Sequence, residues 1–269
     1  HLFYSLTRWR LPTPTRQEDP EAGLAFDFLA DTQKPDGSVE SVLTGHETGI
    51  ITINIAEADD AERERRRATM GEPFRTLLGH FRHEIGHYYW DRLVAQDDGA
   101  LTGFRALFGD ERRDYAEALQ AHYASGAAMG WRDSYVSAYA TAHPWEDFAE
   151  TFAHYVHMVD GLETARSFGI AVRPRVRKSD TLETEVEFDP YRAGSATELV
   201  DAWIPFTVAV NAVNRSIGQP DLYPFVLSGP AKDKLAFVHD LIHDRFRYAR
   251  YGGAVTGQGR AAMTMNSTL

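Results

Sequence analysis

The chain has 269 residues, a formal net charge of −11 and no cysteine. That length accommodates one large domain or two small ones, and the composition is typical of a soluble globular protein. The acidic balance argues against a duplex nucleic-acid binder, which must neutralise phosphates over a broad basic face. Without cysteine there can be no disulfide, no thiolate metal site and no cysteine nucleophile. Any metal must therefore be held by His, Asp or Glu.

No apolar run in the sequence has the length that a membrane span requires. The first residues, 1–8, also lack the basic-then-apolar order of a signal peptide. We therefore expect a cytoplasmic protein with no membrane and no nucleic acid among its partners. The chain does not begin with Met, which is consistent with a fragment of a longer protein.

The first part of the chain, residues 1–70, is predicted to be rich in strands. Residues 1–20 contain Pro and Thr and favour an extended lead-in. Alternation predicts a strand over 24–29, and the β-branched residues of 49–56 predict the clearest strand of the chain. The charged segment 59–67 mixes both signs, so a solvated helix face is a better interpretation than a basic patch.

The next predicted element is a helix from about Pro73 to Val94, with Pro favourable in its first turn. It contains His83-Glu84-Ile85-Gly86-His87, the H-E-x-x-H arrangement in which two imidazoles hold zinc and the glutamate activates water. At 100° per residue the histidines lie opposite an apolar stripe, which counts against a role as core histidines. That stripe consists of Phe74, Leu77, Leu78, Phe81, Ile85 and Tyr88.

A catalytic zinc site needs a third protein ligand and an open position for water. A third histidine on the same helix is excluded, because the required positions hold Trp90 and Leu93. The best candidate is a second helix beginning near Trp145, on which Glu146 and Glu150 share one face. One of these carboxylates can ligate while the other accepts an N–H from a ligating imidazole. His154 and His157 lie two and three turns beyond Glu146, so we do not expect them to share its metal.

The remainder is predicted to be mostly helical, so that residues 71–250 form the helical part of a single unit spanning 1–250. A flexible tail is expected over 251–269. The basic run Arg173–Lys178 is the only support for a nucleic-acid site, and it is short. Further helices are predicted over 104–108, 110–125, 199–213 and 232–247, and a strand or linker over 181–188.

The two motifs together carry a family resemblance. His83-Glu84-x-Gly86-His87, followed some sixty residues later by Glu146-x-Phe-Ala-Glu150-x-Phe-Ala, resembles the gluzincin-type metallopeptidases, particularly the lethal-factor-like and Pro-Pro endopeptidase group. The resemblance implies that Glu146 is the third zinc ligand, that Glu150 supports a ligand, and that Tyr139, seven residues before Glu146, assists catalysis. Over 77–160, with 52–59 upstream, the chain closely resembles a bacterial family of zinc-binding metallopeptidases. Members of that family often carry a Cys-rich zinc ribbon, which this chain lacks.

We therefore predict an α+β, zincin-like fold with a small N-terminal sheet and a helical lobe that brings Glu146 to one zinc ion. Zinc would polarise a water whose proton Glu84 removes, and a peptide or protein would be the substrate. The alternative is a zinc-binding scaffold without hydrolytic activity, although an intact Glu84 favours the enzyme.

Several positions keep two interpretations. Tyr139 is either the donor to the oxyanion or an ordinary packed tyrosine, with Tyr135 also available. For His143 and Asp147 we expect surface or capping roles. The strand over 50–54 is either an edge that pairs with substrate or a buried interior strand.

Overall fold

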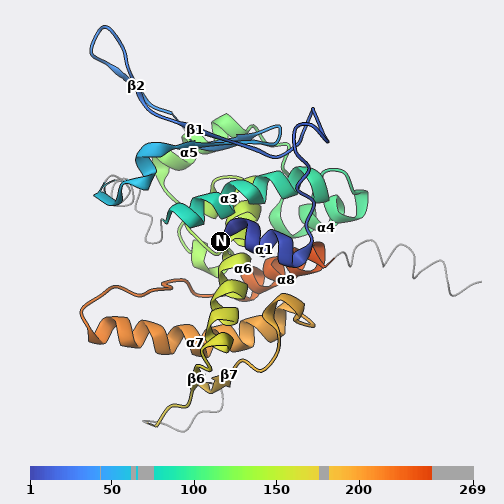
Figure 1. The fold of residues 1–269 in the computed structure, drawn as a ribbon, viewed down its shortest axis with the longest axis vertical. Helices are drawn as coiled ribbons and strands as arrows, with labels where there is room; N and C mark the ends of the chain where they lie inside the picture. Colours follow the sequence, from blue (N-terminus) through green and yellow to red (C-terminus); the bar gives the residue numbers. More distant parts are fainter. Residues whose placement is uncertain (43, 62–64, 66–75, 176–181, 244–269) are drawn as a thin grey trace, which may run out of the picture.

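The structure is a computed structural model that describes residues 1–42, 44–61, 65, 76–175 and 182–243. Two crossing helices occupy its centre, α3 (Leu77–Tyr89) and α6 (Pro144–Ser167) (Figure 1). Thr76 begins α3 by accepting a hydrogen bond from the Gly79 N–H, and Pro144 occupies the first turn of α6, where its missing N–H is not needed. Helices and small sheets together give the α+β class that the sequence predicts.

The crossing of α3 and α6 depends on small residues. A Cβ added at Gly86 would lie 3.0 Å from the Ala149 Cα and 3.3 Å from its carbonyl oxygen. Glycine at this position therefore allows the two backbones to approach closely. Because the approach occurs one residue before His87 and three residues after Glu146, it brings the polar faces of both helices together.

A three-stranded sheet lies along one side of α3 (Figure 1). Its order is β1 (Ala25–Leu29), β5 (Ile50–Asn54) and β4 (Gly45–Glu47), with β1 parallel and β4 antiparallel to β5. The interpretation of residues 50–54 as a substrate-binding edge is wrong, since this strand is paired on both sides and buries Ile51 and Ile53. The edge on this side is β4. A two-stranded hairpin, β2 (Thr32–Gln33) and β3 (Val39–Glu40), extends beyond the sheet.

The N-terminus is helical rather than extended. Residues Leu2–Trp9 form α1, which places Leu2 and Leu6 in the core. Ser5 Oγ donates to Asp160 on α6 at 3.1 Å, and Arg8 pairs with Asp189 at 3.1 Å. A helix of this length gains its stability from such packing, not from its local sequence. The predicted extended lead-in over 1–20 is thus wrong for its first half.

Beyond α3, the helix α6 also contacts α4, α7 and α8. The helices are α4 (Asp98–Phe108), α5 (Tyr115–Ser125), α7 (Ala196–Ser216) and α8 (Gly229–Ile242), and a π-helical segment η2 (Trp90–Val94) continues α3. Short 3-10 turns cover Ile55–Ala58 (η1), Trp131–Asp133 (η3), Tyr139–Thr141 (η4) and Pro190–Arg192 (η6), and β6 (Ala171–Val172) pairs with β7 (Thr184–Glu185).

Over the residues that are described, no helix has both the length and the hydropathy that a bilayer span requires. Five predictions extend outside the described residues and, for those parts, stay predictions. They are the start of the motif helix at Pro73, most of the charged segment 59–67, the end of the basic run 173–178, the end of the helix over 232–247, and the tail 251–269. Arg173 itself pairs with Glu185 of β7.

Candidate metal centre

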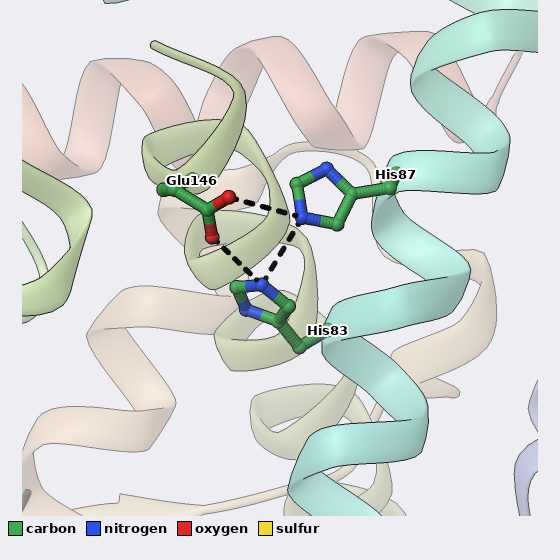
Figure 2. A group of neighbouring side chains, drawn as sticks. All are labelled: His83, His87 and Glu146. Atoms are coloured by element: carbon green, nitrogen blue, oxygen red, sulfur yellow. Dashed lines mark hydrogen bonds and ion pairs between the residues drawn. The ribbon is translucent and has the colours of Figure 1, made fainter. Parts of the chain in front are cut away.

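Three side chains predicted as metal ligands converge where α3 crosses the first turn of α6 (Figure 2). His83 Nε2 lies 3.1 Å from His87 Nε2 and 3.0 Å from Glu146 Oε2, and His87 Nε2 lies 3.6 Å from Glu146 Oε1. Zinc bonds of about 2.0–2.2 Å in tetrahedral geometry place ligand atoms roughly 3.3 Å apart. The separations of these nitrogen and oxygen atoms therefore fit one zinc ion.

The environment of Glu146 supports the same fit. Its side chain is 1% exposed, and apart from the His83 ring that it faces, its Oε2 atom has no hydrogen-bond partner within the described residues. Burial opposes ionisation of Glu146, but the charge of His87 and hydrogen bonds from both histidines hold the pKa of this carboxyl well below its usual range. A buried carboxylate is stable only where a positive charge compensates it. Two imidazoles and one carboxylate are a zinc donor set that leaves a fourth position open.

Glu150 orients one of the two imidazoles. Its Oε1 atom lies 2.8 Å from His83 Nδ1, while Ser137 Oγ donates to Oε2 at 2.6 Å and in turn accepts from the Ala140 N–H at 3.1 Å. Burial raises the pKa of Glu150, but the hydrogen bond and charge of His83 outweigh this and lower it to about 2. An ionised Glu150 holds one proton of His83 on Nδ1, so that Nε2, which faces Glu146 and His87, is the nitrogen that can bind a metal once it gives up its own proton.

The predicted ligands line a cavity of about 460 Å³ together with Glu84 and Tyr139. Glu84 is 8% exposed and follows the ligand candidate His83 directly in α3. The Tyr139 ring centroid lies 5.9 Å from that of His83, and burial together with the charge of Glu146 raises the pKa of the Tyr139 hydroxyl. This hydroxyl therefore stays protonated at neutral pH and can donate a hydrogen bond. The structure thus brings together all six residues to which the sequence assigned a site role.

Tyr115 is a site residue that the sequence did not indicate. It begins α5, lines the same cavity and donates from its hydroxyl to Glu146 Oε1 at 2.6 Å. No spacing rule connects it with a residue 31 positions away, so only the fold reveals this contact. Tyr135, the alternative to Tyr139, lies instead beside Lys234, whose Nζ atom is 4.1 Å from the Tyr135 ring centroid.

The other candidates of the second helix have structural roles. His143 caps α6 by accepting from the Trp145 N–H, in line with the expected capping role. Asp147 is fully buried and pairs with Lys234 at 2.6 Å, so the expected surface or capping role is wrong. His154 Nδ1 bonds to the Tyr223 hydroxyl at 2.9 Å, and His157 bonds to Arg82. These two histidines contact partners other than His83, His87 and Glu146.

An α+β protein in which two histidines of one helix and a glutamate of another meet in a cavity is a candidate metalloprotein. Comparison with known proteins gives the family: residues 1–241 match the sequence model described as "Putative zinc-binding metallo-peptidase". The chain belongs to this family.

Uncharacterized proteins of Mycobacterium tuberculosis and Mycobacterium bovis are similar to this chain, with 44% identity over 245 residues. The matched region covers 90% of this chain and 67% of each relative. No solved structure matches the chain.

Proposed function

We propose that this protein is a zinc-dependent endopeptidase of gluzincin type with a zincin-like fold. His83, His87 and Glu146 would hold one zinc ion, which when bound acts as a Lewis acid toward water and a substrate carbonyl. The observation that carries the proposal is the position of Glu84. This carboxylate lines the cavity beside the three ligand candidates, yet it is not needed to complete their donor set.

Each remaining residue of the site has a role in this proposal. Glu84 accepts the proton of the attacking water and returns it to the leaving amine. Tyr139 donates a hydrogen bond from its hydroxyl to the oxyanion that develops on the carbonyl oxygen when water attacks the carbonyl carbon. Glu150, held by Ser137, keeps the His83 ring in its ligating orientation. The hydrogen bond from Tyr115 fixes the orientation of the Glu146 carboxylate.

The edge strand β4 gives the substrate a place to bind. Thr44, Gly45 and His46 line the cavity, and β4 pairs with β5 on one side. We propose that a peptide pairs in extended form with the other side of β4, where no strand of the described residues pairs with it. This assigns to β4 the role that the sequence suggested for residues 50–54.

Substitution of Glu84 by Gln tests the proposal. This change keeps the size of the side chain and removes its basicity, so zinc should stay bound while cleavage of a diverse peptide library, read by mass spectrometry, falls by about 10³-fold or more. Tyr139→Phe should lower kcat by about 10²-fold, with KM changed less. A Glu84→Gln variant as active as the wild type would refute the mechanism. A wild-type protein that binds zinc and cuts no peptide would favour the scaffold without hydrolytic activity.

A further inference from the structure

One carboxylate in the cavity has no role in the proposed metal binding or catalysis. Asp91 lies one helical turn beyond His87, in the π-helical segment η2, and its side chain is 52% exposed. It lines the same cavity as Glu84 and the three ligand candidates. A substrate bound at the metal centre would therefore meet Asp91 at the cavity wall.

His46, which faces Asp91, does not neutralise the charge of this carboxylate. His46 Nδ1 lies 3.8 Å from Asp91 Oδ2, but burial and the charge of His87 lower the pKa of His46 to about 4. His46 is consequently neutral at pH 7. Its Nε2 atom accepts from the Gly49 N–H at 3.0 Å, which places its own proton on Nδ1, the nitrogen nearer to Asp91. The separation between His46 Nδ1 and Asp91 Oδ2 is thus too long for a hydrogen bond, and the neutral imidazole offers no charge opposite to that of the carboxylate.

In the part of the chain that the structure describes, the charge of His87 favours ionisation of Asp91, but no lysine or arginine pairs with this carboxylate. The described residues that line the cavity include three carboxylates, Glu84, Asp91 and Glu146, and neither lysine nor arginine. Burial raises the pKa of Asp91, which reflects the cost of keeping this charge in a concave site. A ligand cation at this position would remove that cost.

Two aromatic side chains complete the environment. Trp90 and Trp145 line the cavity, with ring centroids 5.3 Å apart. Tryptophan surfaces bind the aliphatic stems of lysine and arginine, and their ring faces attract the cationic groups. The wall that carries Asp91 thus combines one carboxylate with apolar surface, which suits a long cationic side chain better than a short polar one.

We propose that Asp91 binds the lysine or arginine side chain of a peptide substrate, at a residue next to the scissile bond. The inference rests on the proposed peptidase function. It adds a substrate class to that function, namely peptides with a basic residue at one fixed position beside the scissile bond. Trp145, which is only partly buried, contacts the stem of that side chain, and Trp90, 6% exposed, packs against Trp145 from the core side.

Binding measurements test this independently of cleavage. The protein is the zinc-loaded Glu84→Gln variant, and the probes are short fluorescent peptides that differ at one position by Arg, Lys, norleucine or Glu. Fluorescence anisotropy should show Arg and Lys peptides binding about tenfold more tightly than the norleucine peptide, and Glu peptides more weakly. Adding Asp91→Asn should remove this difference and leave the affinity for norleucine peptides within about twofold. Asp201→Asn, which changes the charge equally on an exposed position of α7, should have no effect.

Equal affinities for Arg and norleucine peptides at every position would overturn the proposal, as would a preference that persists in Asp91→Asn. The proposed catalytic function fails in a different way: wild-type protein would then bind the basic peptides and cut none of them. Because binding is read in a variant without the general base, the two failures are distinguishable.

Discussion

The buried ion pair between Lys234 of α8 and Asp147 of α6 gives a prediction whose magnitude follows from the structure. The side chains are 5% and 1% exposed, Nζ lies 2.6 Å from Asp147 Oδ2, and Nζ also donates to the Ser134 carbonyl at 2.9 Å. Lys234→Met keeps most of the side-chain volume but leaves a buried carboxylate without its cation. Breaking such a pair costs about 3–5 kcal/mol, so we expect the free energy of unfolding to fall by about 4 kcal/mol.

Urea denaturation followed by circular dichroism measures this change. Burial raises the pKa of Asp147 to about 7 even with Lys234 beside it, so the experiment belongs at pH 8, where the wild-type carboxylate is ionised. Lys232→Met, at an exposed position of the same helix, is the matched control and should cost little. Adding Asp147→Asn to Lys234→Met should recover much of the loss, because the buried charge disappears. A single variant that loses less than about 1 kcal/mol, or a double variant no more stable than the single, would refute the reasoning.

Three further predictions concern the site and its surroundings. Glu150→Ala should weaken zinc binding by about 10- to 100-fold in competition with a chromogenic chelator, because His83 loses its orienting partner. An unchanged zinc affinity would contradict the role of Glu150 in orienting His83. Gly86→Val should lower the free energy of unfolding by about 1–3 kcal/mol, because a side chain at this position pushes α6 away from α3. The same displacement should weaken zinc binding. A variant with wild-type melting and zinc affinity would show that the close approach of the two helices is unnecessary. His154 is buried, and burial lowers its pKa from 6.5 to about 4. The stability that it contributes is therefore present above pH 6.5 and is lost as the pH falls toward 4. The stability difference between wild type and His154→Gln should shift by about 2 kcal/mol against the wild type between pH 7 and pH 4.5, and parallel pH curves would exclude this assignment.

The sequence predicted the two central helices because their signals are local. His83, Glu84 and His87 have a spacing that only a helix turns into one face, and Glu146 and Glu150 repeat that spacing on a helix that begins at a proline. The opposed apolar stripes then require the helices to pack. Arguments of this kind need no knowledge of the rest of the fold.

The features that the sequence missed all depend on contacts between distant segments. Tyr115 reaches Glu146 across 31 residues, and Lys234 reaches Asp147 across 87, so neither contact leaves a periodic signal. The first helix was missed because its stability comes from contacts with distant segments such as α6. The strand over 50–54 was recognised correctly, but its place in the sheet depends on β4, which is too short to predict from composition.

The central claim, that His83, His87 and Glu146 hold a single zinc ion, is tested most directly by metal content. Elemental analysis of purified, zinc-loaded protein after dialysis should find one zinc per wild-type chain and one per Glu84→Gln chain. His87→Ala and Glu146→Ala should lose nearly all of it, while circular dichroism shows that they remain folded. A folded Glu146→Ala protein that retains a full equivalent of zinc would contradict the account.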